Sequence, residues 1–223
     1  MPMCNNACIA FGVAHLRPED VRNRAVLEVG ARDVNGGLRS IVESLGPASY
    51  LGVDICPGPG VDEICPAERL VQRYGPNSFD IVLTTEMLEH VRDWRLAVSN
   101  LKQVLRPGGL LLLTTRSEGY PLHGYPSDFW RYATEDVLAI FGDFSVKALL
   151  KDPSEPGVLF LGRKPSTGFV EVGLSNYSLY SMITRRRTPR VSDLAFLLFR
   201  TAAAAGRILP SSVRRIVRNV MGV

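Results

Sequence analysis

The stretch VLEVGARDVNGG, residues 26–37, combines a buried strand with a turn that carries little side-chain bulk. Its apolar run ends in Glu28 and Gly30, and a glycine pair follows at residues 36 and 37. Where a backbone passes close beneath a ligand at the carboxyl end of a strand, a residue without a Cβ atom is needed, and Gly30 fits that place. The stretch therefore predicts a ligand site at the end of the first strand of an α/β sheet.

Downstream of this stretch, short apolar runs alternate with helical segments as far as Lys164. That alternation predicts a mostly parallel sheet with helices on both faces. The candidate strands are residues 25–30, 50–55, 79–85, 110–115, 145–150 and 157–163, and the candidate helices are residues 37–45, 66–74, 87–105 and 134–142. The connection KDPSEPG, residues 151–157, is too short for a crossover helix and rich in turn formers. We therefore predict that the sheet ends in an antiparallel hairpin.

Length and charge divide the chain into three predicted parts. With 223 residues it is long enough for one well-buried core and a modest appendage. We expect an N-terminal lid segment at 1–24, a core at 25–165 and a basic helical extension at 166–223. The extension carries nine arginines and no lysine, against only two acidic residues. Its apolar periodicity predicts two helical pieces, roughly 191–207 and 211–221.

The cysteines and the N-terminus indicate in which cellular compartment the protein is expected. Four scattered cysteines do not suit a disulfide scaffold, and the N-terminus lacks the pattern of a signal peptide, so we expect a cytoplasmic protein. No apolar run reaches the length of about 18 residues that a membrane-spanning helix needs. The basic tail leaves three alternatives open: a solvated helix pair docked on the core, peripheral contact with an anionic membrane surface, and binding of RNA or a phosphorylated carrier. A homo-oligomer also stays open.

A carboxylate stands at the end of the second predicted strand. Asp54 follows Gly30 by 24 residues, a spacing at which one carboxylate accepts both hydroxyl hydrogens of a ribose. Taken with the order of the other segments, this spacing predicts that a nucleoside ligand lies across the carboxyl ends of the strands.

The succession LEVGARDVNGG, YLGVDI, SFDIVLTTEMLEHV, LRPGG and LLLTT resembles the class I S-adenosylmethionine-dependent methyltransferases, in particular their type 11 group, over roughly residues 20–165. The resemblance implies a Rossmann-like fold with a seven-stranded, mostly parallel sheet. It implies that Glu28 and Gly30 hold the methionine end of S-adenosylmethionine and that Asp54 binds the ribose. The full set of cofactor-binding residues that it implies is Glu28, Gly30, Arg32, Asn35, Asp54, Ile55, Glu68, Thr84 and Thr85.

The chain departs from the family pattern at two places. The family's acid-x-Gly-x-Gly-x-Gly has Arg32 and Val34 at its second and third glycine positions, so the turn must be built differently. Pro66 stands where an acidic residue often contacts the adenine amino group, and Glu68 follows it. A nicotinamide cofactor would need G-x-G-x-x-G to hold its pyrophosphate, and that pattern is absent. S-adenosylmethionine has no phosphate, so its binding depends less on closely spaced glycines.

The segment TTEMLEHV, residues 84–91, places Glu86, Glu89 and His90 at relative positions 0, 3 and 4, which share one face of a helix. Within the resemblance, this pattern is similar to two subgroups that hold a divalent metal, the ubiquinone-biosynthesis O-methyltransferases and the small-RNA 3′-terminal 2′-O-methyltransferases. Two carboxylates and a neutral imidazole suit Mg²⁺, Mn²⁺ or Zn²⁺, and His123 would complete the set. Such a metal would lower the pKa of the attacking hydroxyl.

Other interpretations of these residues stay open. L-E-H-V also occurs in type 11 enzymes without a metal, in which Glu89 or His90 has a structural or substrate-facing role. Alternatively, His90 or His123 acts as a general base toward a hydroxyl, since the pKa of an imidazole is near neutrality. We predict His90, His123 and Glu89 as the catalytic residues.

The predicted reaction is O-methylation of a small molecule, a glycan or a lipid-like intermediate. Metal-assisted 2′-O-methylation of RNA and a non-catalytic cofactor-binding protein are the alternatives. The segment LHGYPSDFWRYA, residues 122–133, is expected either to form the substrate wall or to be a packed loop in which Asp128 pairs with Arg131.

Overall fold

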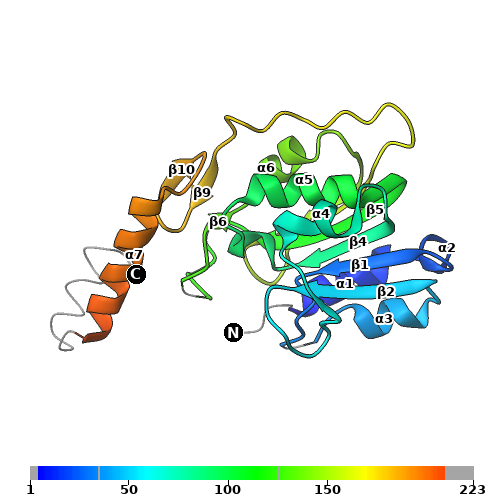
Figure 1. The fold of residues 1–223 in the computed structure, drawn as a ribbon, viewed down its shortest axis with the longest axis horizontal. Coiled ribbons are helices and arrows are strands. Elements are labelled where there is room, and N and C mark those ends of the chain that lie inside the picture. Colours follow the sequence, from blue (N-terminus) through cyan, green and yellow to red (C-terminus); the bar gives the residue numbers. More distant parts are fainter. Residues whose placement is uncertain (1–4, 35, 125, 209–223) are drawn as a thin grey trace.

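A computed structural model describes residues 5–34, 36–124 and 126–208 of the chain. Its centre is a seven-stranded sheet in the order β3-β2-β1-β4-β5-β8-β7 (Figure 1). The strands of this sheet are β1 (Ala25–Val29), β2 (Ser49–Asp54), β3 (Glu63–Ile64), β4 (Phe79–Thr85), β5 (Leu105–Arg116), β7 (Ser145–Lys151) and β8 (Gly157–Arg163). From β3 to β5 the neighbours are parallel, and β8 is antiparallel to both β5 and β7. The predicted Rossmann-like sheet with its antiparallel hairpin is confirmed.

Helices cover both faces of the sheet, as predicted. The helices are α1 (Asn6–His15), α2 (Pro18–Val21), α3 (Arg39–Ser44), α4 (Leu70–Tyr74), α5 (Trp94–Val104), α6 (Thr134–Ile140) and α7 (Asp193–Ile208). Along β5, Leu111 and Leu113 pack into the core with α5 and α6, whereas Leu110 and Leu112 pack into a second core with α1 and α3. All four leucines are buried, because a parallel sheet with helices on both faces needs continuous apolar strands.

The N-terminal segment packs into the body of the protein. Phe11, Leu16 and Val21 are buried and belong to the same core as Leu110 and Leu112 of β5. The α1 helix therefore lies in one helical layer of the sheet. Its lid role toward a substrate stays a prediction.

The long helix predicted over 87–105 is interrupted. A 3₁₀ turn, η2 (Leu88–His90), comes first, and α5 begins only at Trp94, where the Asp93 side chain caps it. Glu86 has a left-handed backbone with φ of 53°, which a helix cannot continue through. The expectation that Glu86, Glu89 and His90 share the face of one helix is therefore wrong.

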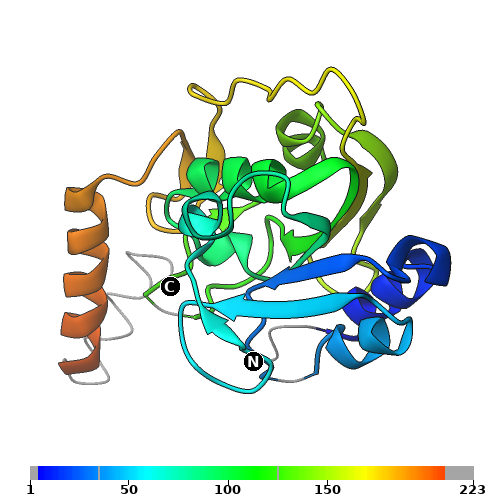
Figure 2. The same ribbon diagram turned by 45° about the vertical axis from the view of Figure 1, so that its right-hand side comes forward.

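The extension after residue 165 supplies two strands of a second, small sheet in the order β10-β9-β6. Its strands are β6 (Trp130–Arg131), β9 (Leu179–Ser181) and β10 (Arg186–Thr188), so the extension pairs with the segment 122–133. The α7 helix then stands beside the body in both views (Figures 1 and 2). It corresponds to the first helical piece predicted in the tail, and the second piece, 211–221, lies outside the described residues. Among the helices that the structure describes, none combines the length and apolarity needed to cross a bilayer.

Candidate active site

Two adjoining cavities lie at the carboxyl ends of the central strands, where open α/β sheets bind ligands. They measure about 560 Å³ and about 420 Å³, and both are lined by Gly30, Arg32 and Val34. The larger cavity is also lined by three other residues predicted to bind the cofactor, Asp54, Ile55 and Glu68, and the smaller by Glu28 and Thr85. Thr84 is buried and lines neither of these two cavities, and Asn35 lies outside the described residues. Most of the predicted cofactor residues thus border these two adjoining cavities, which together are called the trough below.

Gly30 forms the floor of this trough in a conformation that favours glycine. Its φ is 81°, and a Cβ atom at this position would lie 2.7 Å from the Cβ and Cγ atoms of Met87. The amides of Gly30 and Ala31 both donate to the carbonyl of Val53, at 2.9 and 3.0 Å. The start of the turn is therefore held by β2.

Asp54 joins the same turn to the loop that follows β2. Its Oδ2 accepts a hydrogen bond from the Arg32 amide at 3.3 Å, and its Oδ1 accepts one from the Cys56 amide at 2.9 Å. These two bonds orient the carboxylate at the wall of the larger cavity. An oriented carboxylate at the end of the second strand is the group that a ribose diol requires.

Glu28 is the buried acid of the smaller cavity. Its side chain is 4% exposed, and its Oε2 accepts a hydrogen bond from the Tyr50 hydroxyl at 2.7 Å. Burial raises the pKa of Glu28 to about 7, and the Tyr50 hydrogen bond opposes that rise. The carboxyl group therefore changes charge close to neutral pH, where most acids are fully ionised.

This raised pKa predicts a pH-dependent stability. A carboxyl whose folded-state pKa is raised stabilises the protein below its ordinary pKa of 4.5, and that contribution is lost as the pH rises through about 7. We expect the Glu28→Gln variant to gain stability relative to the wild type between pH 5 and 8, by up to about 3 kcal/mol. Urea unfolding of both proteins across this range measures the difference. A constant difference would mean that Glu28 does not titrate there.

Three side chains meet beside the larger cavity, the two imidazoles of His90 and His123 in its lining and the buried carboxylate of Glu89 behind them. Glu89 is fully buried, and its Oε2 accepts a hydrogen bond from the Thr115 hydroxyl at 2.8 Å. Its Oε1 has no hydrogen-bond partner within the described part of the chain and lies 3.8 Å from Nε2 of His123 and 4.0 Å from Nε2 of His90. Both imidazoles line the cavity, and their ring centroids are 4.7 Å apart.

Each imidazole has a polar neighbour at its other ring nitrogen. Nδ1 of His90 lies 2.5 Å from the carbonyl oxygen of Ser127, and because a carbonyl only accepts, this nitrogen must carry a proton. Nδ1 of His123 lies 3.0 Å from Oδ2 of Asp128 without the geometry of a hydrogen bond, and the same oxygen accepts a hydrogen bond from the His123 amide at 2.7 Å. In each ring Nε2 is the nitrogen that lies within 4.0 Å of Oε1 of Glu89.

Asp128 is itself fixed by a buried ion pair. The Arg131 guanidinium donates to both of its carboxylate oxygens, at 2.5 and 2.8 Å. Burial raises the pKa of Asp128, but hydrogen bonds from Arg131 and His123 outweigh it and lower the pKa to about 2. Asp128 therefore remains an anion that orients His123. The expected pairing of Asp128 with Arg131 is found, and Trp130 is a buried core residue that donates from its indole to the Val91 carbonyl.

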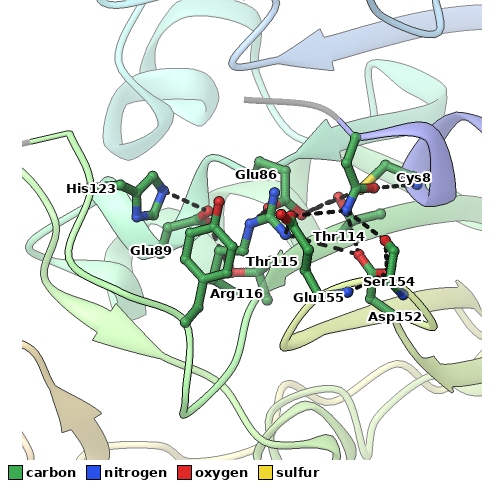
Figure 3. A network of polar contacts seen from close by, with 12 residues as sticks. Cys8, Glu86, Glu89, Thr114, Thr115, Arg116, His123, Asp152, Ser154 and Glu155 are labelled. Atoms are coloured by element: carbon green, nitrogen blue, oxygen red, sulfur yellow. Dashed lines mark hydrogen bonds and ion pairs between the residues drawn. The ribbon is translucent and has the colours of Figure 1, made fainter. Parts of the chain in front are cut away.

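Glu86 faces away from this trio. It is 2% exposed, accepts a hydrogen bond from the Thr114 hydroxyl at 2.8 Å and forms an ion pair with Arg116. Figure 3 places it between Glu89 and Cys8 of α1, whose Sγ lies 3.5 Å from Oε1 of Glu86. Burial raises the pKa of Glu86 well above its ordinary value, and the nearby Glu89 adds to the rise. The structure thus brings together three of the four residues predicted to bind a metal, without Glu86.

Several lining residues of the larger cavity were not predicted. They are Val29, Val34, Cys56, Cys65, Ala67, Met87, Val91, Leu122, Gly124 and Ser127. Most are apolar, and in a sequence an apolar cavity wall has the same pattern as a core. Leu122, Gly124 and Ser127 had a usable signal, because all three lie in the segment 122–133, for which a role as the substrate wall was one expectation.

Residues 8–152 match a family model described as methyltransferase domain, and this span is more than half of the 223 residues. A ubiquinone biosynthesis O-methyltransferase of Rhizobium etli is 30% identical over 125 residues, which cover 50% of this chain and 48% of the relative. A probable phthiotriol/phenolphthiotriol dimycocerosates methyltransferase 2 of Mycobacterium ulcerans is 33% identical over 102 residues, covering 40% and 38%. The chain spans about half the length or less of these curated relatives.

The fold is also that of solved methyltransferases. A structure of 1,6-didemethyltoxoflavin-N1-methyltransferase from Burkholderia thailandensis, with bound 1,6-didemethyltoxoflavin and S-adenosylhomocysteine, superposes with a TM-score of 0.58 at 20% identity. The similarity covers 72% of this chain and 79% of that one. At this identity the likeness shows the fold alone.

Proposed function

The chain belongs to the methyltransferase domain family, among the class I enzymes that depend on S-adenosylmethionine, and on that premise we propose that it methylates a hydroxyl oxygen of its acceptor. The observation that carries this proposal is the Glu89, His90 and His123 trio at the cavity wall. A hydroxyl is a weak nucleophile near neutral pH and needs a group that takes its proton. The trio supplies two imidazoles for that purpose.

The residues of the trough fit the cofactor. S-adenosylmethionine, when bound, supplies a methyl group already activated by its sulfonium. Gly30 leaves the room that a Cβ atom would fill, Asp54 offers an oriented carboxylate to the ribose, and Glu28 would face the methionine end. Because the donor is activated, most of the acceleration is expected from holding donor and acceptor in line.

The protein's own part in the chemistry is a proton transfer. Nε2 of His90 or His123 takes the hydroxyl proton as the oxygen attacks the methyl group. The imidazolium that forms lies about 4 Å from Oε1 of Glu89, which has no other partner within the described residues, so the new charge is paired where it appears. Asp128 keeps His123 in the orientation that this step requires.

A second candidate is metal-assisted O-methylation at the same trio. One ligand atom from each of Glu89, His90 and His123 lies within 4.8 Å of the others. A carboxylate and two imidazoles are a donor set that suits Zn²⁺ or Mn²⁺ and leaves positions for acceptor oxygens. Oε1 of Glu89, which has no hydrogen-bond partner among the described residues, would be available to the metal as a ligand. The metal would supply Lewis-acid activation of the hydroxyl in place of a base.

For the acceptor we propose a small molecule, a glycan or a lipid-like biosynthetic intermediate. The apolar side chains of Met87, Val91 and Leu122 line the larger cavity next to the trio, which suits an acceptor with an apolar part beside its hydroxyl.

The test is a methyl-transfer assay with S-adenosylmethionine across phenolic, glycan, lipid-alcohol and RNA acceptors, read by mass spectrometry as the gain of one CH₂. We expect a hydroxyl acceptor to be methylated, and transfer only to nitrogen or carbon acceptors would contradict the proposal. Each reaction is repeated with a chelator and after adding back Mn²⁺ or Zn²⁺. Activity that survives the chelator supports the histidine base, and activity that is lost and restored supports the metal.

A further inference from the structure

We propose that the outer face of α7, with the arginines beside it, is a docking surface for an anionic lipid bilayer. This surface comprises Leu194, Leu197 and Leu198 of α7 and Arg185, Arg186 and Arg190 before it. The proposal is independent of the acceptor and of the methyl-transfer chemistry, because it concerns a part of the chain outside the two cavities.

The segment that precedes α7 is fixed to the body by polar contacts. The Arg95 guanidinium donates to the Leu174 carbonyl at 2.6 Å and also to the carbonyls of Tyr177 and Pro189. Asp136 accepts a hydrogen bond from the Tyr177 hydroxyl at 2.9 Å and forms an ion pair with Arg187. The start of α7 is therefore tied to α5 and α6.

The first turn of α7 also packs on the body through one face. The Phe196 ring lies 5.3 Å from the Phe129 ring, and the Arg92 guanidinium lies 5.2 Å from the centre of the Phe196 ring. Arg92 further donates to Oδ1 of Asp193 at 2.7 Å. The inner face of the helix thus has its own apolar and charged partners.

The outer face carries exposed leucines. Leu194, Leu197 and Leu198 are 66%, 56% and 58% exposed, and their spacing of three and four residues puts them on one side of the helix, away from Phe196. A groove of about 600 Å³ continues this face, lined by Leu198 of α7 and by Ile183 of the turn between β9 and β10. Exposed leucines are ordinary when single, but a cluster of this kind marks a contact surface.

Exposed basic side chains lie in the β9–β10 hairpin and in the segment that leads into α7, and their charge favours one kind of partner. Arg185, Arg186 and Arg190 are exposed, and Asp193, the single acidic residue from β9 to the end of α7, is paired with Arg92. A second copy of the chain would bring arginines against arginines, and single-stranded RNA favours stacking aromatic side chains over leucines. An anionic bilayer accepts leucines into its interface and attracts arginines to its phosphates.

This surface is connected to the candidate active site. In the small sheet, Ser181 and Tyr180 of β9 pair with Trp130 and Arg131, and the Met182 amide donates to the Phe129 carbonyl at 2.9 Å. Those core residues follow directly after Ser127 and Asp128, which orient the two imidazoles. A bilayer bound at α7 would therefore be linked to the wall of the larger cavity through β9, which pairs with β6.

Vesicle co-sedimentation of the full chain, without cofactor or acceptor, tests the proposal. The probes are phosphatidylcholine vesicles and vesicles that also contain phosphatidylglycerol. We expect binding to the anionic vesicles, weakened by salt, and little binding to the neutral ones. The double variant Leu197→Glu with Leu198→Glu should bind anionic vesicles at least about ten-fold more weakly than the wild type. The variant Leu138→Glu with Leu150→Glu, with the same charge change at two exposed leucines of α6 and β7, should bind like the wild type.

Three results would overturn the proposal: equal binding to neutral and anionic vesicles, unchanged binding of the α7 double variant, or equal losses in both double variants. Light scattering without vesicles tests whether a second copy of the chain is the partner instead. Self-association that depends on Leu197 and Leu198 would assign the face to that second copy. Circular dichroism confirms that each variant is folded. A milder variant, Leu197→Ser with Leu198→Ser, removes the apolar contact without adding charge and should also weaken binding.

Discussion

The Gly30→Ala variant should bind S-adenosylmethionine or S-adenosylhomocysteine roughly ten-fold to a hundred-fold more weakly than the wild type. Gly30 has a φ of 81°, where an alanine is strained, and its Cβ atom would lie 2.7 Å from the side chain of Met87. Either the turn or Met87 must move to relieve this contact. Both line the larger cavity, so either movement changes the shape of the predicted cofactor site.

The matched control for this change is Gly37→Ala. Gly37 also lines the trough, but a Cβ atom there meets no heavy atom within 4 Å, and its φ is not in the left-handed region. Calorimetric titration of both variants with S-adenosylhomocysteine measures the affinities, and thermal unfolding verifies that both are folded. Equal losses in the two variants, or wild-type affinity in Gly30→Ala, would contradict the role assigned to Gly30.

Glu89→Gln should lower kcat by about 10²- to 10³-fold and leave the affinity for the cofactor near that of the wild type. The substitution keeps the shape of the side chain, and its amide oxygen still accepts the Thr115 hydrogen bond. It removes the charge that would stabilise an imidazolium at His90 or His123 or bind a metal. Steady-state kinetics with the acceptor identified by the mass-spectrometric assay, together with calorimetry for the cofactor, separate the two effects.

Glu86→Gln is the informative comparison, because Glu86 is the acid that the sequence placed with the trio and the structure places with Arg116. We expect it to affect mainly stability, since a buried guanidinium loses part of its charge partner. If a folded Glu86→Gln protein lost as much activity as Glu89→Gln, all four predicted residues would act together and the trio would be incomplete.

The fold was predictable because its signals are local. The leucine run 110–113 indicates a strand that is buried on both faces, and KDPSEPG indicates a hairpin whatever the rest of the chain does. The small sheet was missed because β6, β9 and β10 have only two or three residues each, too few to show an alternation. Their pairing depends on contacts such as those of Arg95, which are distant in sequence.

The site was predictable where spacing along one strand determines position. Gly30 directly follows β1 and Asp54 ends β2, and parallel neighbours put their carboxyl ends at the same edge. Glu86 was misplaced for a different reason. Its helical spacing to Glu89 and His90 is correct in the sequence, but a left-handed residue and a distant arginine redirect its side chain. The sequence alone contains no sign of either.

The assignment of the trough to the cofactor is tested most directly by a calorimetric titration of the wild-type chain with S-adenosylhomocysteine, the demethylated form of the donor. We predict saturable binding of one molecule per chain, since the two cavities that make up the trough adjoin at Gly30, Arg32 and Val34. The absence of heat and of thermal stabilisation at millimolar ligand would contradict the assignment of this trough to the cofactor.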